Sequence, residues 1–140
     1  MPRQDIEFQT HDRVVLRGWL YTPSTTEGKL ACLIITHGFS AVIQMNLDVY
    51  AERFVSKLSL ACLVYDHRGF GASDSGPNQP RCEIIPSMQI SDMQDAITYA
   101  QTRDEVDASR IGIWGTSYSA GHCLQVAAYD RRVKACISQV

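Results

Sequence analysis

The chain has 140 residues, of which 45% are hydrophobic and 20% charged, and its formal net charge is −2. This length favours a single domain over residues 1–140, and this composition excludes a disordered or fibrous chain. The sequence has no run of like charges and no long apolar segment, so nucleic acid and membrane partners are not expected. Because it also has no secretory signal pattern, an intracellular protein is predicted.

The first segments predict the edge of a sheet. Residues 5–10 and 13–22 form two extended, partly alternating runs around a short polar turn, which is typical of an antiparallel hairpin. After a turn-rich connection, the run KLACLIITHG at 29–38 is almost entirely apolar, as in a strand that is covered on both faces. It predicts a central parallel strand.

Alternating helices and strands follow. Apolar residues at helical spacing predict a helix over about 45–58, before a second buried strand at 59–66. A loop rich in Gly, Pro and Ser occupies 67–81, and helical spacing returns from Ile90 and ends near Asp104. Three further elements are predicted: a strand at 110–115, a helix to about Tyr129 and a strand at 132–140.

This alternation predicts an α/β fold with a mostly parallel sheet, an N-terminal antiparallel hairpin and helices on both faces. Ligands bind such sheets beyond the carboxyl ends of the parallel strands. The informative residues are therefore expected just after Thr36, Tyr65 and Gly115.

Ser117 occupies the junction between a predicted strand and a predicted helix, in the segment IGIWGTSYSAGH. A sharp turn of this kind needs small residues two positions before and after the serine, and these are Gly115 and Ser119. The start of the helix would aim free N–H groups at the same place. Ser117 is therefore a candidate nucleophile, and a serine that merely caps the helix is the alternative.

The segment THGFS at 36–40 could complete such a site. A backbone N–H after a strand end, offered beside the turn, would give an oxyanion hole with two donors, for which Phe39 and Tyr118 are the candidates. We interpret His37 as a structural residue that holds this loop, and not as a general base. Gly38 is likewise expected to be a structural residue near the site.

The segment YDHRGFGAS at 65–73 follows the second buried strand. Asp66 and Arg68 are expected to brace neighbouring loops through ion pairs and hydrogen bonds, while the glycines allow a tight bend. This role is architectural.

Together these segments resemble the α/β-hydrolases, whose pattern is HG after one strand, D-x-R-G-x-G-x-S after the next and G-x-S-x-G at the turn. The resemblance covers essentially the whole chain and is closest to a dienelactone-hydrolase-like group that includes fungal polyketide transferases and hydrolases of secondary-metabolite pathways. It implies that Ser117 is the acyl-accepting nucleophile and that Phe39 and Tyr118 are the oxyanion donors. Ser119 stands where the general motif has glycine.

In this family the acid and the histidine of the triad follow the serine in sequence. Because the sequence ends at Val140, we expect an incomplete domain, truncated after the sixth strand, with low activity in isolation. His122 lies about 140° around the helix from Ser117 and cannot supply the base. Neither His67 nor His11 has a spacing that predicts contact with Ser117.

The expected function is that of a serine hydrolase or acyl (polyketide) transferase acting on a small-molecule ester or thioester, either free or attached to a carrier. The alternative is a non-catalytic remnant or interaction module. The exposed last strand predicts self-association. No cofactor or metal is predicted, because His and Cys lack ligand spacing and no phosphate-binding motif is present. A cytoplasmic location is expected, with a peroxisomal one left open.

Overall fold

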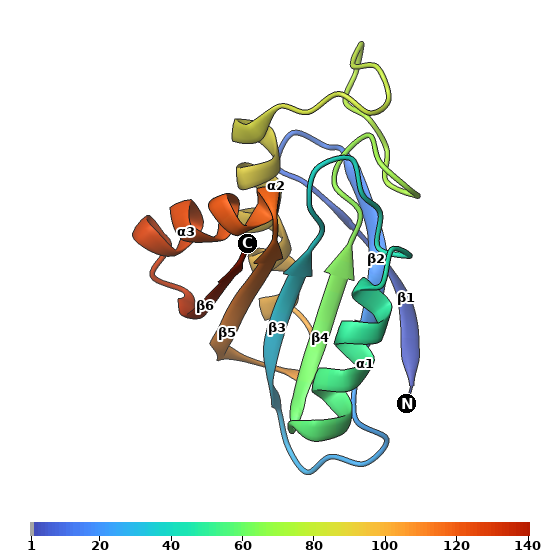
Figure 1. Cartoon of the computed structure of the whole chain (residues 1–140). Helices are drawn as coiled ribbons and strands as arrows, with labels where there is room; N and C mark the ends of the chain where they lie inside the picture. Colours follow the sequence, from blue (N-terminus) through green and yellow to red (C-terminus); the bar gives the residue numbers. More distant parts are fainter. Residues whose placement is uncertain (1) are drawn as a thin grey trace.

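A computed structural model describes residues 2–140 and shows one sheet between helices (Figure 1). Over this range the strands are β1 (Arg3–Gln9), β2 (Val15–Tyr21), β3 (Leu30–Thr36), β4 (Leu60–Tyr65), β5 (Val106–Thr116) and β6 (Val133–Gln139). The helices are α1 (Leu47–Lys57), α2 (Pro86–Gln101) and α3 (Tyr118–Tyr129).

The strands form one sheet in the order β1-β2-β4-β3-β5-β6. β1 pairs with β2, and β2 with β4, in the antiparallel sense, whereas the pairs β3–β4, β3–β5 and β5–β6 are parallel. The carboxyl ends of β3 to β6 therefore meet at one edge. The predicted α/β class, with its hairpin and mostly parallel sheet, is confirmed.

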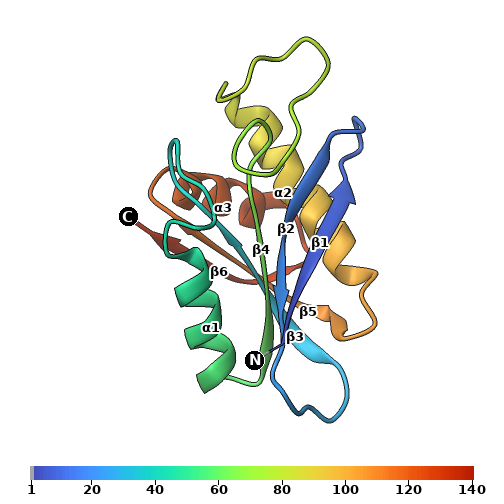
Figure 2. The same ribbon diagram turned by 90° about the vertical axis from the view of Figure 1, so that its right-hand side faces the viewer.

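The helices cover opposite faces of the sheet, and Figure 2 shows α1 and α2 on its two sides. Alternation along the strands explains the two layers, because neighbouring side chains point to opposite faces. Ile34 packs in the cluster that includes α2 and α3, whereas Ile35 packs in the cluster that includes α1. Both side chains are fully buried, which is why the sequence of β3 is apolar without alternation.

Some boundaries differ from those predicted. β5 starts at Val106, several residues before the expected 110, because Val106 pairs with Leu30 beyond a register shift between β3 and β5. α2 starts at Pro86, whose fixed φ suits the first turn of a helix and whose missing N–H is not needed there. The loop that follows β4 is correspondingly longer than the predicted 67–81.

Candidate active site

Ser117 joins β5 to α3 in a strained backbone conformation. Its φ of 54° and ψ of −117° lie where residues other than glycine are rare. The Ser117 N–H donates to the Gln139 carbonyl oxygen at 2.7 Å, so β6 holds the turn in place. The serine is exposed. A strained turn thus presents an accessible hydroxyl at the carboxyl edge of the sheet.

Gly115 allows this turn to close. A Cβ atom at Gly115 would overlap the Ser119 carbonyl group and would lie 2.8 Å from the Cys123 sulfur. No side chain fits in that space. Ser119 itself is fully buried and its side chain does not obstruct the turn.

The loop after β3 passes directly beside Ser117. A Cβ atom on Gly38 would lie 2.9 Å from Ser117 Cβ and 3.2 Å from the Thr116 carbonyl oxygen, so only glycine fits without a shift. The next residue, Phe39, contacts Tyr118 edge to face, with ring centroids 5.6 Å apart. The structure therefore brings Phe39 and Tyr118 together next to Ser117.

The N–H groups of Phe39 and Tyr118 are available for a ligand. Tyr118 is the first residue of α3, and the first N–H groups of a helix have no partner within the helix. Among residues 2–140 the Phe39 N–H makes no hydrogen bond either. Both groups can therefore donate to an incoming oxygen atom.

His37 is buried and its ring nitrogens are both engaged. Its Nε2 accepts a hydrogen bond from the His67 N–H at 3.0 Å, and its Nδ1 lies 3.1 Å from the Gly38 carbonyl oxygen. A proton on Nδ1 satisfies both contacts in the neutral ring. Burial lowers the pKa of His37, which favours that neutral form. His37 thus holds the loop, with its two ring nitrogens bound to the Gly38 carbonyl oxygen and the His67 N–H.

Asp66 connects two loops at the carboxyl edge. Its Oδ1 accepts a hydrogen bond from the Ile43 N–H at 2.9 Å, and its Oδ2 accepts one from the Ala72 N–H at 3.0 Å. Asp66 is fully buried. The loop after β3 and the loop after β4 are therefore joined through one carboxylate.

Arg68 joins the β1–β2 turn to α2. Its Nε donates to Asp92 Oδ2 at 2.7 Å, and its Nη1 donates to Asp12 Oδ2 at 2.8 Å. The hydrogen bonds from Arg68 lower the pKa of Asp12 to about 2. Neither carboxylate partner was predicted, because no local pattern pairs residues so far apart in sequence.

Within residues 2–140 none of the four histidines forms a hydrogen bond with the Ser117 hydroxyl. His67 contacts Ser119, with its Nε2 2.8 Å from the Ser119 Oγ, while His122 pairs with Gln89 and His11 with Asp95. The contact between His67 and Ser119 was missed by the sequence analysis. The serine at 119 in place of glycine was the only signal for it.

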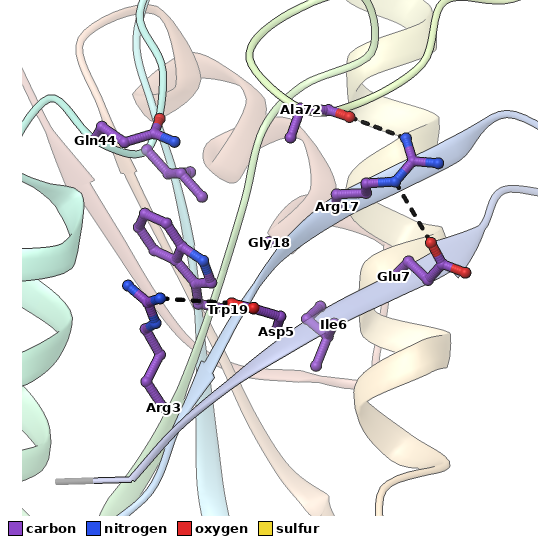
Figure 3. A pocket seen from close by; sticks show the side chains of 10 residues that line it. Arg3, Asp5, Ile6, Glu7, Arg17, Gly18, Trp19, Gln44 and Ala72 are labelled. Atoms are coloured by element: carbon purple, nitrogen blue, oxygen red, sulfur yellow. Dashed lines mark hydrogen bonds and ion pairs between the residues drawn. The ribbon is translucent and has the colours of Figure 1, made fainter.

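A cavity of about 520 Å³ lies away from Ser117, over β1 and β2 (Figure 3). The Arg3 guanidinium covers the Trp19 ring at 4.7 Å from its centre. The charged groups around the cavity pair with each other, as Arg17 does with Glu7 at 3.4 Å. Ser117, Phe39 and Tyr118 do not line it.

No helix in the part of the chain that the structure describes combines the length and apolar character needed to cross a lipid bilayer. Nowhere in residues 2–140 do three or more His, Cys, Asp or Glu side chains gather as a metal site would require.

The family model described as alpha/beta hydrolase fold matches residues 32–140. The quorum-quenching protein AidA of Acinetobacter baumannii is 42% identical over 135 residues, covering 96% of this chain and 42% of that protein. A thiohydrolase of Eupenicillium brefeldianum is 44% identical over 137 residues, covering 98% of this chain and 42% of the thiohydrolase.

A solved structure shows the same fold. The crystal structure of the alpha/beta hydrolase GrgF from Penicillium sp. sh18 matches with a TM-score of 0.88 and 35% identity, covering 96% of this chain and 45% of GrgF. The protein named polyketide transferase grgF, from Penicillium sp, is 36% identical over 138 residues, which are 99% of this chain and 45% of that protein. The chain thus spans less than half the length of these relatives.

Proposed function

Because the chain belongs to the alpha/beta hydrolase family, we propose that Ser117 is the nucleophile of an enzyme that hydrolyses or transfers acyl groups. The resemblance to α/β-hydrolases and to fungal polyketide transferases and hydrolases is confirmed by the family match and by the relatives. Their names support an acyl hydrolase or acyltransferase role. A small-molecule ester or thioester, such as a polyketide intermediate, is the substrate class that we propose for this chain.

One observation carries the assignment of Ser117. The serine has a positive φ and an exposed position at the carboxyl end of β5, directly beside the Gly38 loop. A serine that only caps a helix needs neither the strain nor the close approach of a second loop. Both features suit a nucleophile, because the donors that stabilise the substrate carbonyl oxygen must lie close to the attacking serine oxygen.

In the proposed reaction, Ser117 Oγ attacks the carbonyl carbon and gives its proton to a base. The negative charge that develops on the carbonyl oxygen is stabilised by the N–H groups of Phe39 and Tyr118. The bond to the leaving oxygen or sulfur then breaks, and the alcohol or thiol departs with the proton. Water or an acceptor alcohol then attacks the carbonyl carbon of the acyl-enzyme and gives its proton to the base. The bond to Ser117 Oγ breaks, the acid or the new ester departs, and Ser117 Oγ takes the proton back.

The base and its acid belong, in this proposal, to polypeptide outside residues 1–140. Within residues 2–140 no histidine nitrogen forms a hydrogen bond with Ser117, and the relatives are more than twice as long as the chain. Without a base the hydroxyl is a weak nucleophile, so residues 1–140 alone are expected to react slowly.

The side chains beside Ser117 favour an apolar acyl group. Phe39 is 64% exposed and Tyr118 is 38% exposed, and their rings contact each other. Burying such rings against an apolar chain is favourable. The hydrocarbon part of an acyl chain could contact these rings.

Labelling with a fluorophosphonate, which reacts with activated serines, tests the proposal. The full natural polypeptide that contains these residues is incubated with the probe, and the modified peptide is located by mass spectrometry. We expect modification at Ser117 and none in Ser117→Ala. Ser40→Ala is a matched control, because Ser40 is also exposed with a positive φ on the adjacent loop. Equal labelling of Ser117→Ala, or no labelling of the natural protein at high probe concentration, would contradict the proposal.

A binding module without turnover is the second candidate, and the lack of a base near Ser117 favours it. The partner we propose for it is a second copy of the chain at β6, which pairs only with β5 in residues 2–140 and carries Ile137 at 44% exposure. Unpaired strand edges readily pair with another strand. Sedimentation should then show a dimer that Ile137→Lys weakens, whereas a monomer at all concentrations would exclude this partner.

A further inference from the structure

The Ser119 hydroxyl lies buried between three segments of the site. Its Oγ donates to the His37 carbonyl oxygen at 2.5 Å and lies 2.8 Å from His67 Nε2. Both Ser119 and His67 are almost completely buried. The three segments are the first turn of α3 and the loops after β3 and β4.

The positions of the protons follow from the partners. A carbonyl oxygen only accepts, so the single Ser119 hydroxyl proton is directed at His37. The Ser119 Oγ then accepts from a proton on His67 Nε2, which also lies 3.3 Å from the His37 carbonyl oxygen. Neutral His67 with its proton on Nε2 satisfies this arrangement. Burial lowers the pKa of His67 far below its usual value, in agreement with a neutral ring.

This hydrogen bond joins the two halves of the proposed oxyanion hole. Ser119 is two residues after Ser117 and next to Tyr118, while His37 precedes Gly38 and Phe39. Beyond the last β3–β5 pair, Thr36 and Gly115, no other hydrogen bond within residues 2–140 links residues 37–40 to residues 117–120. Contact between the Gly38 backbone and Ser117 limits how closely the loop can approach. The Ser119 hydroxyl limits how far it can move away.

We propose that Ser119, supported by His67, is a positioning residue that fixes the distance between the Phe39 and Tyr118 N–H groups around Ser117. This inference rests on the proposed function of Ser117. It gives a role to the serine that stands where the general G-x-S-x-G motif has glycine, a residue that could not form this link. The hydroxyl touches no reacting atom and acts through the backbone of the loop.

The test compares Ser119→Ala with a matched control, Ser73→Ala. Ser73 is also fully buried, donates to a carbonyl oxygen (Asp66, 2.6 Å) and accepts a hydrogen bond (from the Arg17 N–H, 2.9 Å), but lies outside the link. Both variants lose a similar pair of hydrogen bonds. We expect Ser119→Ala to slow fluorophosphonate labelling of Ser117 at least about 10-fold, and Ser73→Ala to change it less than about 2-fold, at a temperature where both are folded.

A second readout does not depend on reactivity. The backbone amide resonances of Gly38 and Phe39 should shift in Ser119→Ala and in His67→Gln, and should stay in place in Ser73→Ala. Ser119→Thr, which keeps the hydroxyl, should restore both the resonances and the labelling rate. His67→Gln gives the same information if Ser119→Ala does not fold.

The outcomes separate this inference from the proposed function. If the natural protein is not labelled but the Phe39 resonance shifts only when the link is cut, the link stands and the assignment of Ser117 fails. If Ser119→Ala is labelled as fast as the natural protein and the Phe39 resonance does not move, the positioning role is wrong.

Discussion

Gly38 lies in contact distance of Ser117 although the two residues belong to different loops. A Cβ atom on Gly38 would be 3.5 Å from the Ser117 hydroxyl oxygen and closer still to Ser117 Cβ. The backbone of the Gly38 loop is therefore part of the wall beside the hydroxyl. A side chain at position 38 would push this loop, and with it Phe39, away from Ser117.

Gly38→Ala should consequently impair the site more than the fold. The added methyl meets the Thr116 carbonyl oxygen and the Ser117 side chain, so the loop must shift, and we expect labelling of Ser117 to fall at least about 10-fold. Unfolding free energy should drop by about 1–3 kcal/mol in urea titrations. Gly121→Ala is the control, because nothing lies within 4 Å of its added Cβ, and helix propensity predicts a gain of up to about 1 kcal/mol. Unchanged labelling in Gly38→Ala would mean that the loop is not held against Ser117.

Asp66→Asn should loosen the loops on both sides of the site. An amide group can accept only one of the two hydrogen bonds from the Ile43 and Ala72 N–H groups and must turn its own NH2 toward the other donor. We expect the unfolding free energy to fall by about 2–4 kcal/mol. Faster hydrogen exchange of the Ile43 backbone N–H should accompany this loss of stability. Asp104→Asn, at an exposed position, serves as control and should change stability by less than about 0.5 kcal/mol. Equal stability of the two variants would argue against a bracing role of Asp66.

The alternation of elements could be read from the sequence because it depends on local pattern. The continuous apolar runs of β3 and β4 predict strands covered on both faces, and both strands lie in the middle of the sheet. The start of β5 was missed, since the segment DASR at 107–110 interrupts the apolar pattern. Pairing of Val106 with Leu30, which only the assembled sheet provides, extends the strand.

The site was predictable where it depends on the strand ends and not where it depends on distant partners. Ser117, Gly38 and Phe39 follow strands whose carboxyl ends meet, so their proximity follows from the fold class. The bond from Ser119 to His37 joins residues 82 positions apart, and the arginine at 68 reaches Asp12 across 56 positions. No spacing rule within one segment predicts such contacts.

Arg68→Met should be among the most destabilising single changes. Arg68 is 4% exposed and bonds both Asp92, which is fully buried, and Asp12. Removing the guanidinium leaves a buried carboxylate without its partner, so unfolding free energy should fall by about 3–5 kcal/mol in urea. Asp92→Asn in the same protein should recover part of that loss, because it removes the unpaired charge. Arg53→Met, on the exposed side of α1, is the control. If Arg68→Met lowers the unfolding free energy by less than about 1 kcal/mol, the bonds of Arg68 to the two aspartates are not needed for stability.

The buried histidines predict that stability falls in mild acid. Burial lowers the pKa of His37 and of His67 below the 6.5 of an unperturbed histidine. Below pH 6.5 the unfolded chain takes up protons that the folded chain refuses, so the unfolding free energy decreases as pH falls. Each such site contributes a slope of up to about 1.4 kcal/mol per pH unit. His122, whose pKa burial also lowers, acts in the same direction.

His11 acts in the opposite direction, because the hydrogen bond to Asp95 raises its pKa, but it is largely exposed and its effect should be small. Urea titrations between pH 8 and pH 5 should therefore show a constant stability down to about pH 7 and a decline below it. His67→Gln removes one titrating group, so the slope of its stability against pH should be smaller by up to about 1.4 kcal/mol per pH unit. His11→Gln should leave the slope nearly unchanged. If stability at pH 5.5 equals that at pH 7.5, the histidines beneath the site are not held neutral and the proton on His67 cannot be assigned to Nε2 by burial.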